Sequence, residues 1–322
     1  MMQVHRDLDQ LPGFKNAVIT IGTFDGVHIG HQQIINQLKV TAAKVGGETV
    51  IITFHPHPRK IVGNFGDNIA LLNTLDEKIL LLDKAGINHL VVVPFTKPFA
   101  NQTAEEYCRD FIYHYFKPHT IIIGYDHRFG KNRLGNYHLL EKKGIELGFS
   151  VTEIDEQILN EVTVSSTKIR HALLEHDIPT TNKFLGYAYF FEGMVVKGNQ
   201  LGRTIGYPTA NIKIIDDEKL IPANGVYAVT VLMVNDVKTI NYKHSTINTF
   251  QGMMNIGFRP TVDGKARVIE VNIFNFSEDI YNQIIQVHIH AYIRGEVKFN
   301  GLDELKSQLK IDAIQANKLL GN

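Results

Sequence analysis

Two histidines lie close together in a glycine-rich stretch near the N-terminus, Gly22-Thr23-Phe24-Asp25-Gly26-Val27-His28-Ile29-Gly30-His31. The stretch joins an apolar run to a helical pattern, and a strand–helix junction presents backbone N–H groups that bind phosphate. His28 and His31 are spaced to share one face of a helix start. Such imidazoles can donate hydrogen bonds to phosphate oxygens whose charge grows as a phosphate bond breaks. The stretch lacks the spacing of the dinucleotide motif GxGxxG and the lysine of a Walker A loop.

Simpler interpretations of these histidines exist. Either histidine alone would more often be a partly exposed polar residue, but the pair inside a glycine-rich junction favours phosphate chemistry. A metal site is disfavoured, because no third ligand is evident nearby and the two-histidine zinc helix uses i, i+4 spacing.

A second polar stretch, Val164-Ser165-Ser166-Thr167-Lys168-Ile169-Arg170, opens a later helical pattern. Hydroxyl groups at a helix N-cap, with Arg170 one turn further on, would form a second phosphate cradle. Taken by itself, this stretch is more often a plain N-cap. Together with the two histidines, it favours a shared nucleotide site.

A third stretch covers residues 193–211 and is rich in glycine. Gly198, Gly202 and Gly206 predict a loop whose backbone folds over phosphates, and Pro208 fixes the turn that follows. Thr209 and Asn211 are two residues apart, so they lie on the same side of an extended segment. Their neutral oxygens, with substrate phosphates, suit Mg²⁺. From chemistry alone, Pro-Thr-x-Asn is more often an ordinary turn.

The first 185 residues alternate apolar runs with helical stripes. This alternation predicts parallel βαβ units, whose sheets bind ligands beyond the carboxyl ends of the strands. The predicted strands are Ala17–Ile21, Thr49–Phe54, His89–Val93, Thr120–Ile123 and Ser150–Ile154. The predicted helices are His31–Val45, Leu75–Lys84, Tyr107–Phe116 and Leu139–Leu147, with capping boxes at Thr74/Glu77 and Thr103/Glu106.

After Gly186, strands dominate. Tyr227–Val234, Val268–Phe274 and Ile285–Arg294 are β-rich, and the last two alternate strictly between apolar and polar residues. Period-2 patterning predicts an antiparallel sheet with one buried face, and hence a small barrel. Leu302–Leu320 predicts one amphipathic helix, and residues 236–251 predict a polar surface loop. We therefore expect two domains, residues 1–185 and 186–322.

Composition narrows the class of protein. The 322 residues contain 33 Lys and Arg against 33 Asp and Glu, a balance that argues against a dedicated nucleic-acid or membrane-surface binder. One cysteine rules out a disulfide framework and argues strongly against a thiolate zinc site. Residues 1–11 lack the apolar segment of a signal peptide, and no apolar run reaches ~18 residues. We expect a cytoplasmic enzyme.

The histidine motif makes the chain resemble the HxGH nucleotidyltransferase superfamily, whose members attack the α-phosphate of ATP and release pyrophosphate. The form Gly-x-Phe-Asp-Gly-x-His-x-Gly-His resembles one branch, the bacterial bifunctional riboflavin kinase/FMN adenylyltransferases. This resemblance implies a Rossmann-like first domain, with His28 and His31 as catalytic residues. It implies that nucleotide is bound by Gly22, Phe24, Asp25, Gly26, Gly30, Asp126, Ser165, Ser166, Thr167 and Arg170.

Two further stretches resemble this family, and both follow predicted strands. Phe54-His55-Pro56-His57-Pro58 and Gly124-Tyr125-Asp126-His127-Arg128-Phe129-Gly130 imply flavin binding by His57, Pro58, Tyr125 and Arg128. The family usually has Phe at the position of His127, so packing there is expected to differ.

The stretch 193–211 resembles the flavokinase motif, which implies a six-stranded barrel with a C-terminal helix. The resemblance implies that Thr209 and Asn211 bind Mg²⁺ with ATP, and that Glu270 is the base toward the ribityl 5′-hydroxyl group. It also implies nucleotide contacts from Gly198, Gly202, Arg203, Gly206 and Pro208. Without the resemblance, Glu270 would be taken as a solvated residue. The family often has His at the position of Asn272. The resemblance extends over residues 15–312.

We therefore expect an enzyme that phosphorylates riboflavin to FMN and adenylylates FMN to FAD, using ATP in both steps. We expect it to bind small molecules and to bind neither nucleic acid nor a membrane. We also expect a monomer or weak homo-oligomer. The alternatives are a single-activity enzyme with one decayed site, a non-catalytic flavin-binding module and a tRNA-charging enzyme. The last is disfavoured, because the chain is short and lacks a basic RNA-binding domain.

Overall fold

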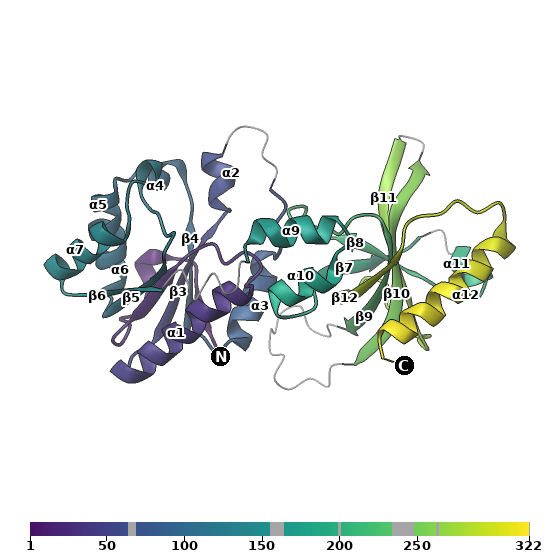
Figure 1. Cartoon of the computed structure of the whole chain (residues 1–322), viewed down its shortest axis with the longest axis horizontal. Helices are drawn as coiled ribbons and strands as arrows, with labels where there is room; N and C mark the ends of the chain where they lie inside the picture. The colour runs from purple at the N-terminus through teal and green to yellow at the C-terminus, as the bar shows by residue number, and fades with distance from the viewer. Residues whose placement is uncertain (64–68, 155–163, 199–200, 234–247, 262–263, 322) are drawn as a thin grey trace. The chain divides into compact units, whose positions relative to one another are not determined.

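The computed structural model describes residues 1–322 except 64–68, 155–163, 199–200, 234–247, 262–263 and 322. The chain forms two compact units, Met1–Ser166 and Thr167–Asn322 (Figure 1). Within the described residues, no helix is both long and apolar enough to cross a membrane.

The first unit is built on a parallel six-stranded sheet. Its strands are β1 (Gln3–His5), β2 (Val18–Ile21), β3 (Thr49–His55), β4 (His89–Pro94), β5 (Thr120–Gly124) and β6 (Ser150–Ile154), in the order β1-β4-β3-β2-β5-β6. The five predicted strands are present. Strand β1 was not predicted, because three residues without a clear apolar pattern give little signal, and β1 is an edge strand paired with β4.

Helices cover both faces of this sheet. The helices on one face are α1 (Ile29–Val45) and α3 (Leu75–Lys84), and those on the other are α5 (Ala104–Glu106), η2 (Tyr107–Tyr113), α6 (His114–Phe116) and α7 (Tyr137–Leu147). Shorter segments are η1 (Leu8–Gln10), α2 (Pro58–Val62), α4 (Lys97–Ala100) and η3 (Lys131–Arg133). Both predicted capping boxes form. The helix predicted over 107–116 instead contains the π-helical segment η2.

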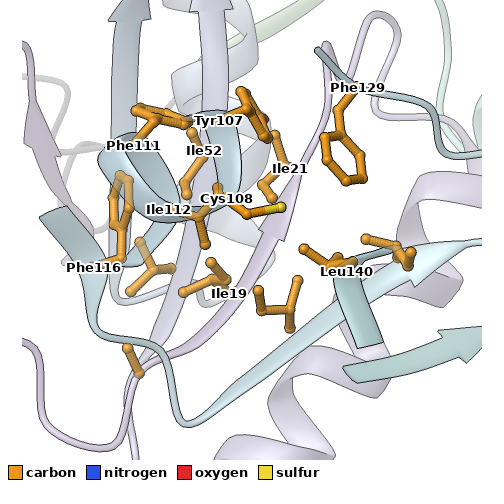
Figure 2. Packing of buried hydrophobic residues seen from close by; sticks show 14 of the residues in the cluster. Ile19, Ile21, Ile52, Tyr107, Cys108, Phe111, Ile112, Phe116, Phe129 and Leu140 are labelled. Atoms are coloured by element: carbon orange, nitrogen blue, oxygen red, sulfur yellow. The ribbon is translucent and has the colours of Figure 1, made fainter. Parts of the chain in front are cut away.

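Each face of the sheet has its own apolar core. On the face of η2 and α7, Ile19, Ile21 and Ile52 of the sheet pack against Phe111 and Leu140 (Figure 2). Cys108 is buried in the same cluster, and burial raises the pKa of its thiol to about 12. A buried thiol with a raised pKa is inert at neutral pH, so the only cysteine serves packing.

The second unit is a closed antiparallel barrel. Its strands are β7 (Phe190–Val196), β8 (Ala210–Ile214), β9 (Gly225–Met233), β10 (Thr249–Thr261), β11 (Gly264–Ile273) and β12 (Ile284–Arg294), in the order β10-β11-β8-β7-β12-β9. Its helices are α9 (Ser166–Leu174), which starts on the last residue of the first unit, α10 (Ile178–Leu185), α11 (Leu201–Thr204) and α12 (Leu302–Leu319). The six-stranded barrel with a C-terminal helix confirms the predicted fold.

Two details of the barrel differ from the sequence prediction. In β12, register shifts follow Ile289 and Tyr292, so the strict alternation predicted through Ile293 breaks. After these irregularities, Ala291 and Ile293 pack in the cluster that contains Ala316 of α12. The surface loop predicted over 236–251 lies outside the described residues up to 247, and Thr249 already begins β10.

The C-terminal helix is fastened to the barrel by an ion pair as well as by apolar packing. Arg294, at the end of β12, donates to both carboxylate oxygens of Asp312 in α12, at 2.9 and 2.6 Å. Asp312 is 1 % exposed. A bidentate pair of this kind fixes direction as well as distance, so it sets the angle at which α12 lies against β12.

Candidate functional site

The predicted residues of the first site follow strands that are neighbours in the sheet. The stretch 22–28 follows β2, residues 56–58 follow β3, and 125–130 follow β5, and β2 lies between β3 and β5. Because the strands are parallel, their carboxyl ends share one edge of the sheet. This edge beside the central strand is where open α/β sheets bind ligands.

The turn after β2 has an unusual backbone. Phe24, Gly26 and Val27 have φ angles of 48°, 88° and 36°. A positive φ is costly for a β-branched residue, and such strain clusters at functional sites. The buried side chains of Phe24 and Val27 anchor the turn, because both belong to the core under α1 and α3.

The two histidines stack on each other at the start of α1. Their ring centroids are 3.7 Å apart with an interplanar angle of 16°. His28 is the N-cap, and its Nδ1 accepts from the backbone N–H of His31 at 3.4 Å. An accepting Nδ1 leaves the ring proton on Nε2, so neutral His28 keeps one N–H donor. The helix predicted to begin at His31 therefore begins two residues earlier, and this places His28 at its cap.

Burial controls the charge of the pair. His28 is 7 % exposed, and burial lowers its pKa to about 4. The pKa of His31 is also lowered, first by burial and then by the positive charges of His28 and Lys78. The Nδ1 of His31 is buried and has no hydrogen-bond partner among the described residues. Both imidazoles are therefore neutral at neutral pH.

Asp25 braces the turn from inside the protein. Its carboxylate accepts from the backbone N–H groups of Leu72 and Asn73 at 2.9 and 3.3 Å, and the residue is 2 % exposed. Its carbonyl accepts from the Ser166 hydroxyl at 2.9 Å. The structure thus brings the histidine stretch and the start of the 165–170 stretch together. Thr167 and Arg170 belong to the second unit, and their nucleotide contacts stay predictions.

One charged residue beside this turn, Lys78, was not predicted from the sequence. Lys78 is 6 % exposed, and burial lowers its pKa to about 8 against the opposing attraction of Asp25. The sequence feature that could have indicated its burial is its position beside Ile79, Leu80 and Leu82, which are buried in α3. A lysine in such a stretch is rarely buried without partners.

The predicted flavin residues lie at the same edge of the sheet. His57 caps α2 by accepting from the Arg59 N–H at 3.3 Å, and Pro58 is the first residue of that helix. Tyr125, Asp126 and Arg128 are exposed.

His127, in the same loop, points a polar atom into the protein. Its Nε2 is buried and has no hydrogen-bond partner among the described residues. Burial lowers the pKa of His127 to about 4.

The second site lies where β8 meets β11. Asn211 and Glu270 are direct cross-strand partners, and the Thr209 hydroxyl lies 3.4 Å from Glu270 Oε1. Asn272, two residues further along β11, donates to the Pro208 carbonyl at 2.7 Å. Sheet pairing therefore gathers oxygens from two distant stretches at one place.

Glycines allow the loop before β8 to approach these residues. A Cβ atom on Gly198 would lie 2.2 Å from the Asn211 amide nitrogen, and one on Gly202 would lie 2.2 Å from the Tyr207 carbonyl oxygen. Gly206 has a φ of 86°, which favours glycine. Arg203 is exposed on α11.

A cavity opens beside Glu270 within the second unit. Its lining includes Thr209, Asn255 and Glu270 of the barrel and Leu305, Leu309 and Asp312 of α12. Arg294 and Glu296 also line it. Arg294 and Asp312 were not predicted as site residues, because an ion pair between a strand and a distant helix leaves no local pattern.

Comparison with known proteins is consistent over both units. The family model of FAD synthetase matches residues 12–168, and that of riboflavin kinase matches residues 185–320. The bifunctional riboflavin kinase/FMN adenylyltransferase of Escherichia coli K12 is 34% identical over 315 residues, which cover 98% of this chain and 96% of that protein. The protein of the same name from Bacillus subtilis is 33% identical over 314 residues, 95% of this chain and 93% of its own.

A solved structure shows the same folds. The crystal structure of a Streptococcus pneumoniae protein named macrolide-efflux protein matches with a TM-score of 0.83 and 30% identity, over 97% of each chain. That name applies to the S. pneumoniae protein. The full-length relatives and the two family models together show that this chain belongs to the bifunctional riboflavin kinase/FMN adenylyltransferase family.

Proposed function

We propose that this chain makes FAD from riboflavin in two steps. The barrel unit phosphorylates riboflavin with ATP to give FMN, and the first unit adenylylates FMN with a second ATP to give FAD and pyrophosphate. The observation that carries this proposal is that each family domain assembles its own polar site: the stacked histidines beside Asp25 in one, and Asn211 opposite Glu270 in the other.

In the kinase step, Glu270 would accept the proton of the ribityl 5′-hydroxyl group as its oxygen attacks the γ-phosphorus of ATP. A base must lie within hydrogen-bond reach of the group that it deprotonates, and Glu270 borders the cavity. The proton passes to the carboxylate, the new P–O bond gives FMN, and ADP leaves. Most of the rate enhancement in phosphoryl transfer comes from positioning and charge stabilisation.

Thr209 and Asn211 would hold Mg²⁺ against the phosphates of ATP in this step. The residues fit such an ion, because the Thr209 hydroxyl lies beside the Glu270 carboxylate, Asn211 is the cross-strand partner of Glu270, and Mg²⁺ prefers hard oxygen ligands. The ion would supply positive charge to the phosphate oxygens. Gly198, Gly202, Arg203, Gly206 and Pro208 would form the loop that covers the nucleotide.

In the adenylyl transfer, the FMN phosphate is itself the nucleophile. It attacks the α-phosphorus of ATP, and the bond to pyrophosphate breaks, so no strong base is required. His28 and His31 would donate to the oxygens that gain charge. Gly22, Phe24, Gly26 and Gly30 would form the backbone of that site. Asp126, Ser165, Thr167 and Arg170 would complete the nucleotide contacts, and His57, Pro58, Tyr125 and Arg128 would contact the flavin.

Further properties belong to the same proposal. We take residues 1–185 and 186–322 as the two domains, because Gly186 ends α10 in a left-handed conformation and the riboflavin kinase match begins at residue 185. Helix α10 nevertheless packs with the barrel, since Asn182 donates to the Ile289 carbonyl at 2.9 Å. We also propose a cytoplasmic monomer or weak homo-oligomer that binds small molecules and neither nucleic acid nor membrane.

Chromatographic analysis of products tests the function. The full chain with riboflavin, ATP and Mg²⁺ should give FMN and then FAD. A product mixture that contains FMN but no FAD would show that the chain has only the riboflavin kinase activity. FAD from supplied FMN, with no FMN from riboflavin, would leave only the adenylyltransferase. Flavin binding without ATP consumption would favour the non-catalytic module.

A further inference from the structure

A buried lysine lies behind the turn that follows β2, and neither proposed step uses it. Lys78 comes from α3, four residues after the capping residue Thr74. Its side chain is almost fully enclosed. Taking an ammonium group out of water is expensive unless other groups compensate its charge. The arrangement around Lys78 shows which groups do so.

The Lys78 ammonium is connected to the turn by two routes. It donates to Thr53 Oγ1 of β3 at 3.5 Å, and Thr53 Oγ1 donates to the Thr23 carbonyl at 3.2 Å. Asp25, in the same turn, attracts Lys78 electrostatically. Lys78 therefore contacts the backbone of the turn through the Thr53 hydroxyl, and it attracts the carboxylate of Asp25 in the same turn through charge.

The same charge acts on the histidine pair. Among the described residues, Asp25 from the turn and His31 from α1 interact electrostatically with Lys78, and His28 is stacked on His31. Strand β3 contributes Thr53, which does not titrate. Charges in a buried site interact strongly, because little water screens them. A fixed positive charge beside His31 therefore opposes its protonation.

The neutral state matters for the geometry of the pair. His28 Nδ1 accepts the N–H of His31 and so caps α1. Protonation of His28 would turn this acceptor into a donor and break the cap. Two protonated rings at a centroid distance of 3.7 Å would also repel each other. Protonation of His28, or of both rings together, would therefore destabilise the stacked arrangement.

We propose that Lys78 is a positioning residue for adenylyl transfer, which fixes the 22–28 turn and keeps the stacked imidazoles neutral so that they can act as N–H donors to the triphosphate. This inference rests on the proposed function of the first unit. Lys78 acts through the turn and through His31, and it need not contact the substrate.

Lys78→Met tests this role, because it removes the charge and keeps most of the side-chain volume. FAD formation from FMN and ATP should fall about tenfold, less than the ~10²–10³-fold loss typical of a donor that contacts the developing charge. FMN formation from riboflavin should be unchanged. The pKa of His31, followed by NMR of protein labelled with ¹⁵N-histidine, should rise, and the acidic limb of the FAD-formation profile should move to higher pH.

Two companion variants sharpen the test. Burial lowers the pKa of Lys78 to about 8, so FAD formation by the wild type should decline above that pH. Lys78→Arg keeps its charge there and should remove the decline. Lys84→Met, an exposed position on the same helix, should match the wild type in every measurement.

An unchanged pKa of His31 in folded Lys78→Met would overturn the proposal, since a packing role alone predicts that result. If Lys78→Met does not fold, the comparison with Lys78→Arg decides. The proposal is overturned if FAD formation declines above pH ~8 equally in the wild type and in Lys78→Arg. If the wild type makes no FAD at all, the proposed function fails, while the NMR titration still decides whether Lys78 controls His31.

Discussion

Asn211 and Glu270 face each other directly across β8 and β11, although 59 positions separate them in the chain. The Thr209 hydroxyl reaches the same carboxylate at 3.4 Å. Hydrogen bonding between the two strands therefore places Asn211 beside the proposed base Glu270, which lines a cavity together with Thr209. The residue roles proposed for the kinase step depend on this register.

Replacing Glu270 by Gln should abolish most FMN formation from riboflavin, by about 10²–10⁴-fold, because a general base contributes that much. The amide keeps the size of the side chain but cannot take the hydroxyl proton. FAD formation from supplied FMN should persist. Initial rates of both reactions are measured on the same preparation.

Glu278→Gln is the matched control for that experiment, because Glu278 is exposed outside the strands. Retention of full kinase activity by folded Glu270→Gln would contradict the assigned role, as would an equal loss of both activities.

Replacing His31 by Ala should suppress FAD formation by about 10²–10³-fold, the usual cost of losing one donor to a developing charge. FMN formation should be spared, because the residues of the kinase site all lie in the second unit. His138→Ala, an exposed position on α7, serves as the control. If His31→Ala impairs both steps equally in a folded protein, the division of labour is wrong.

Replacing Gly198 by Ala should impair the kinase step without unfolding the chain. The added Cβ would meet the Asn211 side chain at 2.2 Å, so this amide must move away from its place opposite Glu270. We expect a raised KM for ATP in FMN formation. Gly13→Ala is the control, because a Cβ there meets nothing within 4 Å. Unchanged kinase kinetics in Gly198→Ala would show that the position of Asn211 is not needed.

Replacing His127 by Phe should make the protein less sensitive to acid. Burial lowers the pKa of His127 to about 4 in the folded state, below its usual value of 6.5. The unfolded chain then binds more protons, so this residue reduces stability as pH falls from about 6.5 to 4. Phe cannot bind a proton, so the variant loses this pH-dependent contribution to stability. It also lacks the buried Nε2 atom of His127, which has no hydrogen-bond partner among the described residues. The unfolding temperature, measured from pH 5 to 7.5, should vary less in the variant.

His138→Gln controls for the loss of an exposed histidine and should keep the wild-type pH dependence. Equal pH dependence in the wild type and His127→Phe would show that His127 is not buried as a neutral ring.

The local features were readable from the sequence. Runs of four to six residues predicted five of the six strands of the first unit, and two capping boxes predicted helix starts such as that of α3, because each of these depends on residues within one turn or one strand. Period-2 alternation predicted β11 and β12, and a β-rich run predicted β9. The motif at 22–31 and the stretch at 193–211 marked both proposed sites, since glycine, proline and histidine spacing is itself a local property.

What the sequence could not supply is pairing over long distances. Three contacts join elements that are far apart in the chain. They are the contact of buried Lys78 with Thr53, the Arg294–Asp312 ion pair and the pairing of Asn211 with Glu270. The register shifts in β12 belong to the same class, because closure of the barrel decides which residues of a strand face α12. Local patterns report the preferences of a segment, whereas burial and charge depend on what the rest of the fold places against it.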